Sequence, residues 1–239
     1  MVKLRRAGRK DHLSQGHGGF KIVDRRCPVS EQTPEEEIFN IFSHGAGFCL
    51  SCIGLIHIWE SYGHAATLGQ LITMLVYALA WIVLYSASTL YHAAHDLERK
   101  AYLRMLDHCA IFVVIAASYG PYVLHALADF QGYLLWFLSW LIAVVGCIFK
   151  FKSEYRYHVH STWLYLIQGW MVTITLPTLI SGLSNAAFAW LCLGGLFLTG
   201  GTYFYIRDDV KYNHGAWHLC VLVGSFCFYL SILDLLTVG

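Results

Sequence analysis

The fold is decided first by the stretch Ala65–Tyr91, which reads AATLGQLITMLVYALAWIVLYSASTLY and contains no charged residue. A helix that crosses the hydrocarbon core of a bilayer needs about 20 predominantly apolar residues. The stretch is rich in Leu, Ile and Val and is long enough to cross the core. The sequence therefore predicts a transmembrane helix here.

The rest of the chain has a similar composition. Of its 239 residues, 57% are hydrophobic and 13% are charged, whereas soluble domains carry about 25% charged residues. An aromatic content of 15% also argues against intrinsic disorder. Six further apolar stretches are Ile38–Trp59, Cys109–Ala128, Tyr133–Phe149, Ser161–Ser181, Ala186–Ile206 and Gly215–Leu233. We predict an all-α integral membrane protein, a bundle of seven transmembrane helices. The first span has the weakest pattern, because Asn40, Ser43 and His44 lie in its opening turns.

Basic residues all fall on one side of the predicted membrane. Eight of the 16 Lys and Arg residues precede the first span, and the others follow the second, fourth and sixth spans. Those others are Arg99, Lys100, Arg104, Lys150, Lys152, Arg156, Arg207 and Lys211. Because cytoplasmic loops are enriched in Lys and Arg, the pattern predicts a cytoplasmic N-terminus and an external C-terminus. A plasma membrane or a bacterial inner membrane is the expected location.

The chain is expected to divide into a tail and one membrane domain. Residues 1–34 are predicted to be a basic, disordered cytoplasmic tail without the apolar segment of a signal peptide. A tail that binds anionic lipid is the alternative. Residues 35–239 form the predicted seven-span domain. Thr33 and Glu36 have the spacing of a capping box, and Pro34 suits a first helical position, so the first helix is predicted to begin there. The net charge of +1 favours no nucleic-acid partner.

Five polar residues are predicted to meet at the cytoplasmic ends of three spans. They are Ser88 and His92 on the second span, Asp107 on the third, and His214 and His218 on the seventh. Residues four apart share a helix face, so His214 and His218 can reach one ion, as the histidines of an HExxH helix do. Three histidine ligands with a fourth position left for water are typical of catalytic zinc. Asp107 would then hold and deprotonate that water, and Ser88 would donate a hydrogen bond.

Other interpretations of these residues remain open at this point. The histidines would also fit hydrogen bonds between helices, and Asp107 would also fit a pairing with Arg104 or a cap on the third span. The remaining histidines are not expected to be ligands, because they lie out of phase with the cluster, low in the first span, in a basic loop, or toward the external side. They are His44, His95, His108, His158, His160, His57, His64 and His125.

Four motifs in order resemble the hemolysin III family. They are Ser88-Thr-Leu-Tyr-His92, Leu106-Asp107-His108-Cys-Ala-Ile-Phe, Ser118-Tyr119-Gly-Pro121 and His214-Gly-Ala-Trp-His218, and the opening Glu37-Ile-Phe-Asn40-Ile-Phe-Ser43-His44 is also similar. That family is grouped with the progestin and adipoQ receptors, including the adiponectin receptors, and more distantly with the alkaline ceramidases. The resemblance implies a seven-helix bundle with its N-terminus inside and Zn²⁺ held near the cytoplasmic surface. It implies His92, His214 and His218 as ligands, with Asp107 and Ser88 around the water on the zinc.

Two functions are compatible with this site. The first is a zinc-dependent hydrolase, ceramidase-like, acting on the amide or ester of a membrane lipid, because a site at headgroup depth suits an amphiphilic substrate. The second is a non-enzymatic receptor or homeostasis regulator in which zinc is structural. The open coordination position beside a carboxylate favours the enzyme. Transport is disfavoured, because no charged residues line the middle of the spans.

Overall fold

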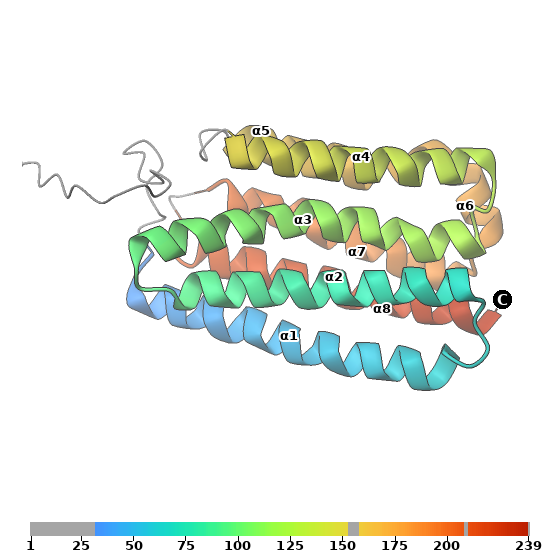
Figure 1. Cartoon of the computed structure of the whole chain (residues 1–239), viewed down its shortest axis with the longest axis horizontal. Helices are drawn as coiled ribbons and strands as arrows, with labels where there is room; N and C mark the ends of the chain where they lie inside the picture. Colours follow the sequence, from blue (N-terminus) through green and yellow to red (C-terminus); the bar gives the residue numbers. More distant parts are fainter. Residues whose placement is uncertain (1–31, 153–157, 208–209, 239) are drawn as a thin grey trace, which may run out of the picture.

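The computed structural model describes residues 32–152, 158–207 and 210–238, and the predicted tail therefore lies almost wholly outside the described residues. The described segments are helical and contain no strand (Figure 1). The helices are α1 (Pro34–Tyr62), α2 (Leu68–Ala93), α3 (Leu97–His125), α4 (Phe130–Lys152), α5 (His158–Trp170), the 3₁₀ segment η1 (Met171–Thr175), α6 (Leu176–Gly182), α7 (Asn185–Tyr205) and α8 (Asn213–Val238).

Seven helical segments in the described part of the chain are long and apolar enough to cross a membrane, which confirms the predicted all-α, seven-span fold. Six of them are single helices, and the fifth, Ser161–Gly182, combines α5, η1 and α6. The interruption lies directly before Pro177. A proline ring crowds the carbonyl four residues earlier, here Thr173, and its nitrogen donates no hydrogen bond. A tightened turn at η1 is the expected result.

Polar caps define where several helices begin. The predicted capping box at the start of α1 is confirmed: the Thr33 hydroxyl accepts from the Glu36 N–H, and the Glu36 carboxylate accepts from the Thr33 N–H. Thr67 and Gln70 form a second capping box at α2, which the sequence analysis did not identify. Each box satisfies two backbone donors that would otherwise lack partners at a helix start.

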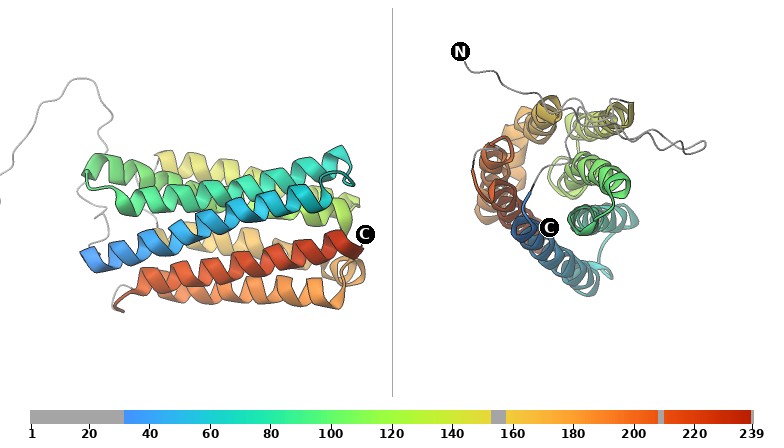
Figure 2. Two further views of the ribbon diagram at one scale, coloured as in Figure 1. Left: turned by 90° about the horizontal axis from the view of Figure 1, so that it is seen from below. Right: turned by 90° about the vertical axis from the view of Figure 1, so that its left-hand side faces the viewer.

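The first and last helices of the bundle, α1 and α8, pack against each other. α1 packs against both α2 and α8, and it lies between them when viewed from below (Figure 2). α3 packs on α2 and α4, and α7 packs on α8. The outer helices keep many large apolar side chains exposed, including Phe42, Leu50, Phe130, Trp163 and Leu196. Such a surface is stable in lipid and would be a liability in water.

Small residues let α7 and α8 approach closely. A Cβ atom added to Gly194 would lie 2.6 Å from the Phe228 ring and 3.0 Å from the Gly224 carbonyl oxygen. No side chain larger than hydrogen fits there without a shift. Close backbone approach at glycine is a common source of packing energy between membrane helices, because lipid offers no hydrophobic driving force for their association.

The described basic residues gather at one end of the bundle. Arg99, Lys100 and Arg104 lie in the first turns of α3, Lys150 and Lys152 end α4, and Arg207 and Lys211 lie between α7 and α8. These helix ends lie together, on the left in Figure 1. The same end carries the last turn of α2 and the first two turns of α8, where the histidines of interest occur.

Candidate metal centre

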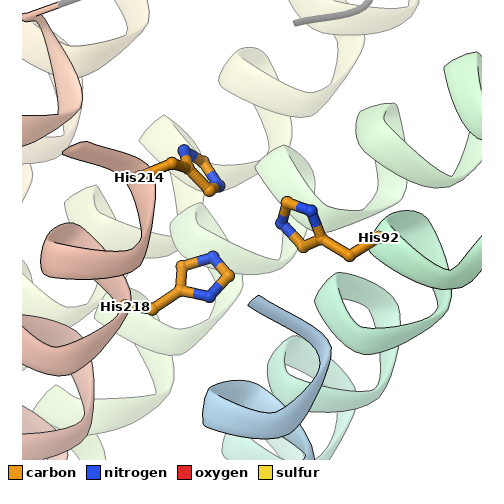
Figure 3. Close-up of side chains that lie close together, drawn as sticks. All are labelled: His92, His214 and His218. Carbon is orange, nitrogen blue, oxygen red and sulfur yellow. The ribbon is translucent and has the colours of Figure 1, made fainter. Parts of the chain in front are cut away.

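Three histidines from two helices converge at this end of the bundle. His92 occupies the last turn of α2, and His214 and His218 occupy successive turns at the start of α8. Their rings point toward a shared space (Figure 3). One ligand atom from each ring lies within 4.8 Å of the others. The ring centroids are 5.0 Å apart for His92 and either partner, and 4.6 Å apart for His214 and His218.

Two of these buried rings have a nitrogen atom without a hydrogen-bond partner in the described part of the chain. His92 and His218 are almost completely buried, and His214 is partly buried. The Nε2 atoms of His92 and His214 are buried and have no hydrogen-bond partner among the described residues. A buried polar atom without a partner is costly and uncommon in native structures. One metal ion would satisfy both atoms, so the residues present fit a metal centre.

The ligand set restricts the metal without identifying it. Imidazole nitrogen suits zinc, copper, iron and nickel, whereas magnesium and calcium prefer oxygen ligands. Three histidines also leave room for a further ligand in a four-coordinate site, the arrangement of catalytic rather than structural zinc. The cluster is therefore a candidate site for a transition metal of the zinc type.

Asp107 on α3 and Ser88 on α2 lie against each other. Both are buried, and Ser88 precedes His92 by one helical turn and so shares its face of α2. The Ser88 side chain lies beside the Asp107 carboxyl, although its Oγ makes no hydrogen bond within the described part of the chain. Arg104 is also near enough to Asp107 to interact with it electrostatically.

The alternative in which Asp107 caps the third span is wrong. α3 begins at Leu97 with Asp96 as its N-cap, so Asp107 lies about three turns inside the helix and cannot cap it. The charged segment from Glu98 to Arg104 is helical as well and continues directly into the apolar part of α3.

Helix α1 supplies polar residues to the centre that the sequence analysis did not assign. The Glu37 carboxylate lies 2.6 Å from His92 Nδ1 and 2.6 Å from Lys100 Nζ. The Ser43 hydroxyl lies 3.1 Å from His218 Nδ1. A spacing of three and four residues from Glu37 through Asn40 to Ser43 and His44 is the signal that places these polar side chains on one helix face.

His44 also lies beside the three histidines, although the sequence analysis set it apart from them. Its ring stacks on that of His218 and meets the Tyr85 ring edge to face. Both its nitrogens are buried without a hydrogen-bond partner among the residues described. His108, by contrast, has Lys150 Nζ 3.3 Å from its Nδ1 and the Tyr205 hydroxyl 3.4 Å from its Nε2.

An apolar cavity of about 180 Å³ begins next to this group of rings. It lies between α1, α2 and α8, and its lining includes Tyr85 at the histidine end and Tyr229 farther along the bundle. On α1 the lining runs from Gly47 to Ile58, which is about 16 Å at 1.5 Å per helical residue. The cavity is therefore long, mostly apolar, and close to the metal centre at one end.

Comparisons with known proteins agree with this architecture. Residues 32–229 match the family described as "Haemolysin-III related". The chain is 33% identical over 201 residues to the "Hemolysin-3 homolog" of Bacillus subtilis (strain 168), covering 84% of this chain and 94% of the relative. It is 33% identical to the "Hemolysin-3" of Bacillus cereus, covering 84% and 92%. It is 29% identical to the human "Monocyte to macrophage differentiation factor", covering 89% and 90%.

Proposed function

The chain belongs to the haemolysin-III related family, and from this premise we propose that it is a zinc-dependent membrane hydrolase that cleaves the amide or ester bond of a lipid. The observation that carries the proposal is the group of three histidines, His92, His214 and His218, in which the buried Nε2 atoms of His92 and His214 have no hydrogen-bond partner among the described residues. Ser88, one helical turn before His92, lies beside the Asp107 carboxyl. Hydrolytic metal sites need these parts: nitrogen ligands, an open position, and a group that accepts a proton.

The proposed chemistry assigns a role to each side chain. A divalent ion bound by the three histidines would polarise a carbonyl and activate water near neutral pH. Asp107 accepts a proton from the attacking water and passes it to the leaving amine or alcohol. The buried Ser88 hydroxyl lies beside Asp107 and orients its carboxylate, or donates a hydrogen bond to the substrate oxygen.

The cavity between α1, α2 and α8 favours an amphiphilic substrate. Its apolar walls suit a hydrocarbon chain, and its histidine end lies at the bundle end that gathers the basic residues. A lipid with its chain in the cavity would bring its polar linkage toward the histidines. Lipid headgroups and chains meet at this depth, so the substrate would not leave the bilayer.

A non-enzymatic receptor or homeostasis regulator is the second candidate. One observation favours it: the histidine cluster links α2 to α8, and a metal held there would join these two helices even without any reaction. In this case the metal contributes to folding stability, because binding to the folded state alone stabilises it.

The first experiment is elemental analysis of the detergent-purified chain beside His218→Ala, with His64→Ala as the matched control. His64 is exposed at the opposite end of the bundle. We expect about one zinc ion per chain in the wild type and the control, as a three-histidine site holds one ion, and none in His218→Ala. A folded wild type without metal would overturn the proposal.

The second experiment tests turnover on the same samples. Ceramides and phospholipids in mixed micelles are incubated with each protein, and released fatty acid is measured. The enzyme proposal expects release by the wild type and by His64→Ala, and none by His218→Ala. Zinc-loaded wild type that releases no fatty acid, but melts at a lower temperature after chelation, would favour the regulator.

A further inference from the structure

We infer that helix α1 orients two of the histidines before the metal binds. Glu37 holds His92, and Ser43 holds His218, in the neutral tautomer with the proton on Nδ1. The Nε2 atom of each ring is then free to bind the metal. The inference rests on the metal-binding part of the proposed function and is independent of hydrolysis. It makes Glu37 and Ser43 positioning residues, since they act through the histidines.

The proton count at Ser43 favours one tautomer of His218. A serine hydroxyl has one hydrogen to donate. Ser43 Oγ donates it to the carbonyl oxygen of Asn40 at 3.0 Å, within α1. The 3.1 Å contact between Ser43 Oγ and His218 Nδ1 is therefore a hydrogen bond only if the ring nitrogen donates. With its proton on Nδ1, a neutral His218 ring carries its lone pair on Nε2.

An independent count at Glu37 fixes the tautomer of His92. The Lys100 ammonium donates to one carboxylate oxygen of Glu37 at 2.6 Å, which favours the ionised form of the acid. An ionised carboxylate only accepts, so His92 Nδ1 donates to the other oxygen at 2.6 Å. His92 Nε2 is then the free nitrogen, and it is the buried atom that has no hydrogen-bond partner within the described residues.

Helix α1 is suited to this task because it packs against both helices that carry the ligands. Glu37 reaches a ligand on α2, and Ser43, about two turns farther along α1, reaches a ligand on α8. The start of α1 is also tied to the start of α8, where the Glu36 carboxylate accepts from the Tyr212 N–H at 2.8 Å. A single rigid helix therefore sets both rings before any metal arrives.

The direct test reads the tautomers in metal-free protein. Nitrogen-15 NMR of histidine-labelled protein separates the two neutral tautomers by the shifts of their ring nitrogens, and His92→Ala and His218→Ala identify the signals. We expect both rings to show the Nδ1–H form in the wild type. An Nε2–H form at either ring would overturn the inference without any variant at Glu37 or Ser43.

Variants then test whether α1 sets the preference. Ser43→Ala removes the acceptor and is expected to mix the tautomers of His218, whereas Ser43→Thr keeps a hydroxyl and restores the Nδ1–H form. Glu37→Ala is expected to mix the tautomers of His92. Glu37→Gln is expected to restore the Nδ1–H form in part, because an amide oxygen also accepts a hydrogen bond.

Ser118→Ala and Glu35→Gln are the controls. Ser118 bonds within α3, and Glu35 is exposed on the first turn of α1.

Zinc affinity, measured by competition with a chromophoric chelator, gives the second readout. Loss of a hydrogen bond that orients a metal-binding histidine costs about 10- to 100-fold in affinity. We expect losses of this size in Ser43→Ala and Glu37→Ala and none in the controls. Unchanged tautomers and affinity in both variants would overturn the inference. A wild type that binds zinc but hydrolyses no lipid would defeat the hydrolase proposal and leave this inference intact.

Discussion

The ring of His44 lies flat on the ring of His218, with their centroids 3.4 Å apart and their planes within 9° of parallel. His218 is thus held on one face by His44 and at Nδ1 by Ser43, both from α1. A ring confined in this way cannot turn freely about its side-chain torsions. The stack therefore orients a candidate metal ligand, and His44 needs no bond to the metal to do so.

Substitution of His44 separates stacking from ligation. His44→Phe keeps a flat ring and removes two unpartnered buried nitrogens. We expect its zinc affinity to stay within about threefold of the wild type, because the large losses in metal affinity come from removing hydrogen bonds to the ligands and His44 makes none within the described part of the chain. His44→Ala removes the stack and leaves a hole, which should lower the free energy of unfolding by about 1–3 kcal/mol. Thermal melting and chelator competition measure both. Loss of zinc in His44→Phe would show that His44 is itself a ligand.

Asp107 is predicted to act in turnover and not in metal binding. Asp107→Asn keeps the size of the side chain but removes its capacity as a base, so we expect a normal zinc content and a fall in kcat of about 10²- to 10⁴-fold. Ser88→Ala is expected to follow the same pattern with a smaller loss. Asp129→Asn, at the opposite end of the bundle, serves as the control. Loss of zinc in Asp107→Asn would instead place the carboxylate among the ligands.

The fold could be predicted from the sequence because hydropathy and helix starts are local signals. The uncharged run in α2, the capping box of Thr33 and Glu36, and the four-residue spacing of His214 and His218 each need only neighbouring residues. Lipid forces every backbone group to bond within its own helix. Each of the seven apolar stretches therefore predicts one transmembrane helix.

The α1 side of the candidate metal centre could not be predicted in this way. Asn40, Ser43 and His44 weaken the apolar pattern of the first span. They become buried beside the histidine cluster only because α1 packs between α2 and α8. Contacts such as Glu37 to His92 join residues 55 positions apart. No periodicity within one helix specifies which face meets another helix that far along the chain.

Close packing of α7 on α8 is expected to depend on Gly194. A Cβ atom there would overlap the Phe228 ring, and overpacking in a tight interface costs about 1–3 kcal/mol. The neighbouring Gly195 has no atom within 4 Å of its added Cβ, so Gly195→Ala should be neutral or more stable by up to about 1 kcal/mol through helix propensity. Thermal unfolding in detergent should therefore give a lower Tm for Gly194→Ala than for Gly195→Ala. Equal values would mean that this interface adapts freely.

The basic end of the bundle is predicted to face the cytoplasm. The described Lys and Arg residues flank only the α2–α3, α4–α5 and α7–α8 connections, and positive loops are retained on the cytoplasmic side. A periplasmic alkaline phosphatase fused after Gly239 should be active in a bacterial host, and a green fluorescent protein fused there should stay dark. The opposite pair of results would reverse the orientation and place the histidine cluster on the external side.

The cavity is expected to set the length of the lipid chain that is cleaved. Ala78 is buried on α2 and lines the cavity, so Ala78→Phe should shorten the space for a chain without touching the histidines. Each methylene left unburied costs about 0.8 kcal/mol, close to fourfold in binding. We therefore expect the ratio of kcat/KM for long over short acyl chains to fall about 15-fold, which corresponds to two lost methylenes, while zinc content stays the same. Leu79→Phe is the matched control, because Leu79 is adjacent in sequence but half exposed on the outer surface of the bundle. If Ala78→Phe lowers kcat/KM equally for every chain length, the substrate chain lies elsewhere in the protein.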